Sequence, residues 1–399
     1  MNDREQDNLT RGEFRRSQAA PRRSGGFGRA LRVLLTLLIV LAVVVAAAWK
    51  DLKSLDSVKR LFSYNKITQD EQGKAELYAF SNDRSNVFAL LGEKLLVVST
   101  TGVQLLGSDG ESVYTGNVKL TNPAIAVGGQ TAAVYDVGAQ TLLIFSGSGL
   151  VRDMSGECSG GILSVSLNSS DYLALNTEKS GYKSAVTVYD AAGEKVFAFR
   201  SSERYVIDAA VLRDCKHMAA VTLGESDGAF ANTVSLYALE SEKAVAVNTL
   251  TGSLVLSLGS VGGTLSCLTD DSLTLLRSDG SLAGSYRFPY PYLRGASMDG
   301  ESFAALLLSR YRSGSALRLV TVGADGEELA SLDSRSEVLS LSAAGKYVAV
   351  LYSDSLVIYT PQLEEYARLD GTEYAREVRM RADGTAVLVG SASAWLYIP

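Results

Sequence analysis

The residue types that carry out most enzymatic chemistry are scarce in this sequence. It contains a single histidine, His217, and three widely separated cysteines, Cys158, Cys215 and Cys267. One histidine cannot form a His-ligated metal cluster and argues against a Ser-His-Asp triad. The cysteines form no Cys-x-x-Cys pair, and an odd, sparse set is not a disulfide framework. We therefore expect no metal, no cofactor and no enzymatic activity.

The other motifs with known chemistry are also weak. Asp270-Asp271 is interpreted as a hairpin turn, because no Asp-x-Asp-x-Asp-Gly calcium loop occurs. No glycine-rich loop follows a strand into a helix, so a phosphate site is not indicated. Cys267 lies in an apolar segment and is expected to be buried, whereas Cys158 and Cys215 are expected to be partly exposed.

Recognition by aromatic and cationic side chains has better candidates. Three segments are predicted to be enlarged loops that mix an aromatic residue with small and polar ones: Thr177–Ala185, Gly224–Thr233 and Ser309–Ala316. In a fourth, Phe288–Arg294, two prolines restrict the backbone beside two tyrosines. Tyr and Arg are favoured at binding surfaces because they combine contact area with hydrogen bonds. The candidate ligand-binding residues are Tyr182, Lys183, Phe230, Tyr290, Tyr292, Arg294, Arg310, Tyr311 and Arg312.

These side chains must be positioned by short strands, which the sequence repeats from about residue 76 onward. Asp-Gly pairs, which support tight hairpin turns, begin at Asp109, Asp227, Asp279, Asp299, Asp325, Asp370 and Asp383. The clearest repeat, Val338–Gly371, reads as four strands. Similar units begin near Val87, Ala124, Ile162, Val206, Leu254, Leu293, Val338 and Arg376. Four-stranded repeats of about 40 residues are typical of propeller blades.

The two ends of the repeat region predict how the ring closes. The final unit has only three strands before Pro399, and one surplus strand, Glu76–Ser81, precedes the first unit. We therefore expect the surplus strand to complete the last blade. The predicted fold is an all-β β-propeller of eight four-stranded blades, with seven blades as the alternative and a pair of β-sandwiches as the structural runner-up.

In such a ring, the strand 2–3 hairpins and the blade-to-blade connections share one face. The four aromatic segments belong to this face, and most Asp-Gly turns belong to the opposite one. The candidate residues are therefore expected to gather over neighbouring blades. A structural interpretation stays open, because long hairpins pack on each other and tyrosines at loop bases fill gaps between blades.

An apolar segment precedes the repeats. Val33–Trp49 contains no charged residue and, with the residues just before it, is long enough to cross a bilayer. The sequence predicts a transmembrane helix over residues 30–49, with a cleaved signal peptide ending near Ala46–Ala48 as the alternative. The Arg-rich stretch before it places the N-terminus in the cytoplasm and the propeller outside.

The predicted segments are a disordered Arg-rich cytoplasmic tail over residues 1–29, the helix over 30–49, a stalk and linker over 50–74, and the propeller over 75–399. The arginines of the tail either set the topology only or also lie on anionic headgroups. The expected location is the cell membrane, with a single pass.

The repeats resemble degenerate WD-repeat or quinoprotein-type blades in spacing and hydrophobic pattern. The Trp-Asp and Gly-His pairs of true WD repeats are absent, and the only tryptophans are Trp49 and Trp395. The plan of basic tail, membrane helix and propeller resembles an uncharacterised family, a domain of unknown function, of single-pass membrane-anchored proteins from Gram-positive, clostridia-like bacteria. That resemblance implies the fold and the anchor but no function.

The charge balance narrows the partners. The net charge is −6, and residues 1–32 carry eight arginines and four acidic residues, which leaves about −10 for the rest. An acidic domain disfavours nucleic acid. We expect a binding or scaffolding module of the cell envelope, with the membrane and an envelope protein, peptide or glycan as partners. The alternatives are a sensor that signals through the tail, or a carboxylate-based glycan-active enzyme, which needs acidic residues that converge on the channel.

Overall fold

The computed structural model describes residues 34–40, 56, 60, 63–65, 67–226, 228–313 and 316–399. The chain divides into two compact units, Met1–Phe62 and Ser63–Pro399. Residues 34–40 of the first unit are helical. Among the described residues, no helix has the length and apolar character needed to cross a membrane. The predicted tail and most of the predicted membrane span lie outside the described residues, as do 12 of the 25 residues of the predicted stalk and linker.

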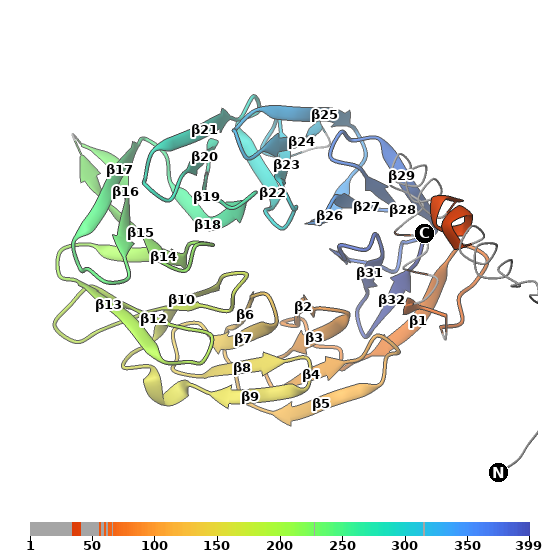
Figure 1. Cartoon of the computed structure of the whole chain (residues 1–399), viewed down its shortest axis with the longest axis horizontal. Helices are drawn as coiled ribbons and strands as arrows, with labels where there is room; N and C mark the ends of the chain where they lie inside the picture. Colours follow the sequence, from red (N-terminus) through yellow and green to blue (C-terminus); the bar gives the residue numbers. More distant parts are fainter. Residues whose placement is uncertain are drawn as a thin grey trace, which may run out of the picture. The chain divides into compact units, whose positions relative to one another are not determined.

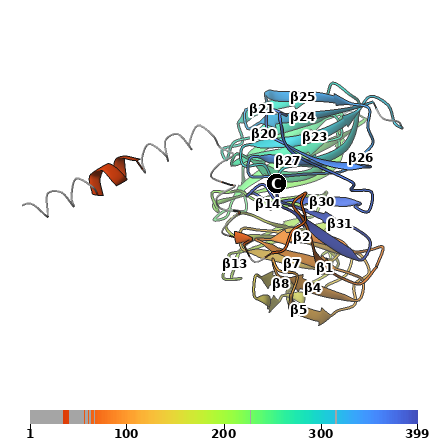
Figure 2. The same ribbon diagram turned by 90° about the vertical axis from the view of Figure 1, so that its right-hand side faces the viewer.

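The second unit consists of eight antiparallel sheets, each of four strands, arranged in a ring around a central axis (Figure 1). The strands run between the two faces of the ring, as the side view shows (Figure 2). From the innermost strand outward, blade 1 is β2 (Val87–Leu91), β3 (Lys94–Val98), β4 (Gly102–Leu106) and β5 (Ser112–Asn117), and blade 2 is β6 (Pro123–Val127), β7 (Thr131–Asp136), β8 (Leu142–Ser146) and β9 (Gly149–Asp153).

A short 3-10 helix, η1 (Ser155–Glu157), leads into blade 3. Blade 3 is β10 (Ile162–Leu167), β11 (Leu173–Thr177), β12 (Ser184–Tyr189) and β13 (Lys195–Ser201); blade 4 is β14 (Tyr205–Val211), β15 (His217–Ser226), β16 (Ala229–Ala238) and β17 (Ala244–Thr251); blade 5 is β18 (Val255–Val261), β19 (Thr264–Thr269), β20 (Ser272–Leu276) and β21 (Leu282–Arg287).

The last three blades complete the circle. Blade 6 is β22 (Tyr292–Ser297), β23 (Phe303–Ser309), β24 (Leu317–Gly323) and β25 (Glu328–Ser334); blade 7 is β26 (Val338–Ala344), β27 (Tyr347–Tyr352), β28 (Ser355–Tyr359) and β29 (Glu365–Asp370); blade 8 is β30 (Glu377–Met380), β31 (Ala386–Val389), β32 (Ser393–Tyr397) and β1 (Lys74–Ala79).

The burial of each strand follows from its place in the blade. The middle strands are mostly apolar, and every residue of β23 and β27 is buried. Outermost strands alternate, as in β17, where half-buried and exposed residues take turns. Continuous apolar runs are expected where both faces of a strand are covered, and alternation where one face meets solvent. The pattern therefore reflects blades that pack face to face.

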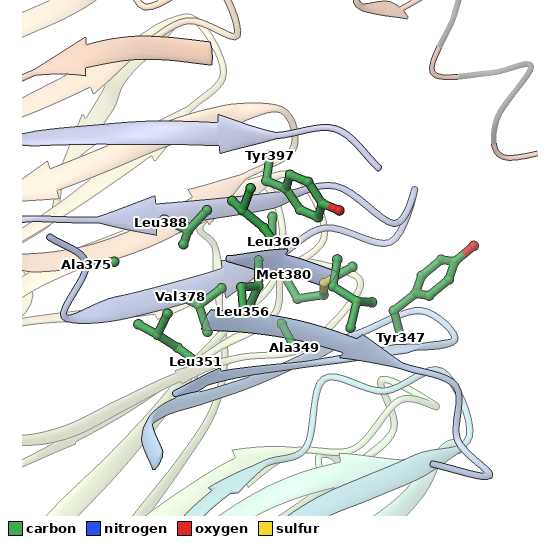
Figure 3. Close-up of a cluster of buried hydrophobic side chains, with 12 residues drawn as sticks. Tyr347, Ala349, Leu351, Leu356, Leu369, Ala375, Val378, Met380, Leu388 and Tyr397 are labelled. Atoms are coloured by element: carbon green, nitrogen blue, oxygen red, sulfur yellow. The ribbon is translucent and has the colours of Figure 1, made fainter. Parts of the chain in front are cut away.

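The described residues of the ring form eight buried clusters, one between each pair of neighbouring blades. Figure 3 shows the cluster between blades 7 and 8, in which Leu351 and Leu356 pack against Val378 and Leu388. Full burial of such a side chain contributes roughly 1.5–3 kcal/mol. Each blade shares its two faces with its neighbours, so the hydrophobic stabilisation is spread around the whole ring.

The ring closes as the sequence predicts. β1 pairs antiparallel with β32, from Lys74 opposite Tyr397 to Ala79 opposite Ser393, and so becomes the outermost strand of blade 8. The predicted count of eight blades is confirmed. Each predicted unit start lies within one residue of the observed first strand, as Val206 does for β14 and Leu254 for β18.

Arg381 lies at the seam where the ring closes. It is only 5% exposed and lies in the turn between β30 and β31. Its Nη2 donates to the Tyr78 hydroxyl of β1 at 3.0 Å and to the Glu93 carbonyl of blade 1 at 2.6 Å. Its Nη1 donates to the Tyr64 hydroxyl at 3.3 Å, and that hydroxyl donates to Asp383 at 2.7 Å. One guanidinium of blade 8 thus connects to Tyr64, to β1 and to blade 1, all of which are distant from Arg381 in the sequence.

The expected loop over Gly224–Thr233 is wrong. β15 and β16 are ten-residue strands that stay paired out to Ser226 and Ala229. The turn signal, Asp227-Gly228, lies in the middle of the segment, so the ladder continues on both sides of it. Blade 4 therefore carries an extended hairpin in place of an irregular loop.

Candidate functional site

The sequence-predicted residues lie at the strand 2–3 end of their blades. Tyr182 and Lys183 are in the β11–β12 loop, and Arg310, Tyr311 and Arg312 are in the β23–β24 loop. Tyr290 is in the β21–β22 connection, and Tyr292 and Arg294 belong to the start of β22. Phe230 is in β16, and its side chain lies outside the described residues.

Blade 6 contributes most of the exposed groups. Tyr292 is 39% exposed and Tyr311 57%, and the Ser309 hydroxyl donates to the Tyr311 carbonyl at 2.7 Å, which fixes the start of the loop. Tyr290 differs, because it packs on the buried cluster between blades 5 and 6. Its ring lies 5.3 Å from the Arg318 guanidinium, which is also paired with Asp333. The structural interpretation therefore applies to Tyr290.

Three arginines on this face are available for a ligand. The Arg294 Nη1 donates to the Arg312 carbonyl at 3.3 Å, which holds the guanidinium beside the β23–β24 loop. Arg310 and Arg312 are exposed. Among the described residues, none of the three has a carboxylate within ion-pair distance. Most of their donors remain free to bind carboxylate or carbonyl groups.

Blade 3 carries a second, smaller group. The exposed Tyr182 ring lies 5.5 Å from the Arg200 guanidinium, and the Lys183 ammonium lies 5.2 Å from the Tyr205 ring. Such cation–π contacts order exposed loops modestly. Blades 4 and 5 lie between the two groups, and the β19–β20 hairpin of blade 5 is a short turn, where Thr269 Oγ1 donates to Asp271 at 2.9 Å. The interpretation of this aspartate pair as a hairpin turn is confirmed.

A cavity of about 520 Å³ opens between blades 6 and 7 at the same end of the ring. Of the predicted site residues, it includes Arg294. The other lining residues were not predicted, because their sequence pattern is that of ordinary strand positions. The cavity is lined by Arg294, Gly295, Leu307, Leu317, Glu337, Val338, Leu339, Ser340 and Leu341.

A second cavity, of about 640 Å³, lies at the opposite end of the ring among the strand 1–2 turns of blades 2 to 6. Asp299 is part of its lining, and its carboxylate accepts a hydrogen bond from the Ser297 hydroxyl at 3.2 Å. Most of the other lining residues are small or aliphatic, such as Gly128, Ala210 and Gly262. The other charged or amide side chains of its lining are Asn168, Arg213 and Glu301.

Asp208 is an acidic residue of an innermost strand that the sequence did not single out. Its Oδ2 accepts the Leu258 N–H of blade 5 at 2.9 Å, and its Oδ1 accepts the Ala209 N–H at 2.9 Å. Burial raises the pKa of Asp208, and these hydrogen bonds partly offset the effect. The carboxylate therefore links β14 to β18, which is a structural role.

The cysteines and the histidine are structural as well. Cys267 is buried and Cys215 half-buried, as expected. The expectation of partial exposure is wrong for Cys158, which η1 and the blade 2–3 cluster enclose. Burial, followed by nearby Glu157 and Asp153, raises the pKa of Cys158 to about 11. The described residues hold no group of three metal-ligating side chains.

The lone histidine belongs to a surface turn. His217 Nδ1 lies 2.6 Å from the Asp214 carboxylate in the β14–β15 turn. Partial burial raises the pKa of Asp214, but the Lys216 and His217 N–H groups and the imidazole outweigh it, so the pKa lies below its usual value. The pair stabilises the turn.

The strand order defines an eight-bladed β-propeller with four-stranded blades. Residues 64–368 match a family of unknown function, DUF5711, and the chain belongs to that family. No curated protein is detectably similar in sequence.

Two solved structures show the same fold. The C-terminal WD40 domain of Sif2 aligns with a TM-score of 0.58 at 12% identity, over 83% of this chain and 100% of that one. The computationally designed Ika8 protein aligns with a TM-score of 0.55 at 11% identity, over 81% and 99%. At these identities the likeness concerns the fold alone.

Proposed function

We propose that the propeller is a non-enzymatic binding or scaffolding module, held at the cell membrane by residues 30–49 with the ring outside the cytoplasm. The charge-free run Val33–Trp49 and the arginines before it support the anchor and its orientation. The partner is an envelope protein, peptide or glycan.

One observation carries the binding role. The strand 2–3 face of blade 6 presents exposed Tyr292 and Tyr311 together with Arg294, Arg310 and Arg312, which have no carboxylate partner among the described residues. Tyrosine and arginine are enriched at protein interfaces because they supply contact area and several hydrogen bonds. Five of the seven Asp-Gly turns lie on the other face, in short strand 1–2 and 3–4 turns. The ring thus concentrates its recognition groups on one side.

The test is crosslinking of the full-length protein in its own cells with a membrane-impermeant reagent. The test variant changes Tyr292, Tyr311 and Arg312 to Ala and leaves Tyr290, which packs on the core. A matched control changes the exposed Arg213, Lys216 and Leu282, on the opposite face, to Ala. A specific partner captured by the parent and the control but lost from the test variant is expected. Identical capture by all three proteins would show that this face is structural.

A further inference from the structure

The innermost strands of five successive blades share a β-bulge near the same end. In β10 the pairing shifts between Ile162 and Ser164, and in β26 between Val338 and Ser340. The innermost strands of blades 1, 2 and 8 pair without such a shift. The bulged residues are Leu163, Ile207, Leu256, Arg294 and Leu339, from blades 3 to 7 in order.

A bulge places an extra residue opposite a single partner and turns its side chain away from the regular pleat. All five bulges lie at the beginning of the innermost strand, which is its strand 2–3 end. Leu256 is 49% exposed and Leu339 42% exposed, although both belong to the inside of the ring. This end of the innermost strands therefore carries an arc of three exposed bulged residues on successive blades, Leu256, Arg294 and Leu339, whereas Leu163 and Ile207 are half-buried.

The arc enters the cavity between blades 6 and 7. Arg294 and Leu339, the bulged residues of these blades, both line it, and Leu307 and Leu317 add buried aliphatic walls. Arg294 brings a positive charge held next to the β23–β24 loop by its bond to the Arg312 carbonyl. The side of the cavity on blade 7 carries the opposite charge, through the exposed Glu337.

We propose that this cavity binds an extended peptide segment of a partner protein in which an aliphatic side chain lies next to a carboxylate. The aliphatic side chain enters against Leu339 and Leu307, and the carboxylate pairs with Arg294. Aliphatic walls give a sugar ring no flat surface for stacking, and Glu337 repels a polyanion. The inference rests on the proposed function and names the ligand class for its face.

Glu337 sets the direction of the segment. Its carboxylate on the blade 7 side repels an acidic residue there, so the carboxylate of the ligand must face blade 6. Replacement of Glu337 by Gln removes this repulsion, so an acidic peptide is expected to bind several-fold more tightly. A hydrophobic ligand without a carboxylate would not respond to the change.

The experiment is a selection from a random dodecapeptide display library on the full-length protein in lipid nanodiscs. Enriched peptides are expected to carry Leu, Ile or Val within two positions of Asp or Glu. A synthetic copy of the best peptide, followed by fluorescence anisotropy, is expected to bind Arg294→Gln and Leu339→Ser at least tenfold more weakly. Arg213→Gln and Leu282→Ser, exposed residues of the opposite face, serve as matched controls and are expected to stay within twofold of the parent.

The outcomes separate this inference from the proposed function. The assignment of an acidic–aliphatic peptide would be overturned by a selection that enriches no peptide, by enriched peptides without acidic residues, or by equal binding to Arg294→Gln. It would also be overturned if the crosslinking experiment captured only a glycan or a lipid. If crosslinking still depends on Tyr292, Tyr311 and Arg312 in that case, the proposed binding face is supported although its ligand is not an acidic–aliphatic peptide. If crosslinking is unchanged in that variant while the selected peptides need Arg294 and Leu339, the cavity is a peptide site and the tyrosine loops are not part of it.

Discussion

At the scale of single residues, Asp208 shows how a polar group can serve the ring from inside. It accepts backbone N–H groups from its own strand and from β18, so two neighbouring blades share one carboxylate. Its burial nevertheless favours the neutral acid, and the pKa of Asp208 is raised. Keeping the Asp208 carboxylate ionised in the folded protein therefore lowers the free energy of unfolding, by an amount that depends on pH.

This cost predicts a pH dependence with a definite sign. The folded protein takes up a proton at Asp208 before the unfolded chain does, so the group adds stability as pH falls. The unfolding free energy of the parent minus that of Asp208→Asn is expected to rise between neutral pH and about pH 4. Urea unfolding at several pH values measures it.

Asp279 is the matched control with the opposite sign. Hydrogen bonds from the Ser281 hydroxyl and N–H lower the pKa of Asp279, so its contribution is lost as the pH falls toward and below about 4. The corresponding difference for Asp279→Asn is expected to fall over that range. A parallel response of the two variants would contradict the assignment of burial to Asp208.

Sequence reasoning reaches some single residues and misses others for a physical reason. Tyr292, Tyr311 and Arg312 could be predicted from the sequence because they belong to segments that are longer than a tight turn. Leu256 and Leu339 could not be predicted, because a bulge depends on the register between two strands. The alternation of residues within one strand does not indicate that register. The part of the candidate site that was predicted thus consists of the loops and of Tyr292 and Arg294 at the start of β22.

At the scale of elements, the turn dipeptides explain why strand positions were predicted well. Asp109, Asp279 and Asp325 begin strand 3–4 turns, and Asp299 and Asp383 begin strand 1–2 turns. A fixed turn sets the register of both flanking strands. The one misjudged element, the β15–β16 hairpin, failed because its polar residues suggested a loop although its Asp-Gly turn indicated a continuous ladder.

One of these turns also positions the closing strand. Gly110, in the β4–β5 turn, has a φ of +82°, and a Cβ there would overlap the Leu77 carbonyl of β1. Gly371 has a similar φ of +76°, but a Cβ there meets nothing within 4 Å. Both Ala substitutions carry the positive-φ cost, and only Gly110→Ala also displaces β1.

We expect Gly110→Ala to destabilise the protein by roughly 1–3 kcal/mol more than Gly371→Ala, the usual cost of overpacking. Chemical unfolding of the two variants beside the parent measures the difference. Equal losses would mean that β1 moves away freely and that the contact does not position it.

At the scale of the whole molecule, the closed ring could be predicted because a surplus strand and a three-stranded final unit must complement each other. The role of Arg381 at the seam could not be predicted. Arg381 looks like any turn arginine in sequence, and only the juxtaposition of β1, blade 1 and blade 8 surrounds it with Tyr64, Tyr78 and Glu93. Residues that join distant segments carry no local pattern.

The seam predicts a large effect from one side chain. Arg381→Met leaves two hydroxyls and a carbonyl without their charged donor, so a loss of about 3 kcal/mol or more is expected. Arg277→Met is the control, because Arg277 is an exposed turn arginine that donates to the Leu282 carbonyl. Its loss is expected to stay within about 0.5 kcal/mol. Similar losses in both variants would contradict a special role for the seam.

The pairing of β1 with β32 also determines when the protein can be finished during biosynthesis. A ribosome makes Lys74 long before Tyr397, so β1 waits, with its pairing edge open, until β32 has been synthesised. An interrupted chain is left as an open arc with an unpaired strand at one end and an uncovered apolar blade at the other, the features that proteases and chaperones recognise. Closure of the ring therefore distinguishes chains that have reached β32 from chains that stopped before it.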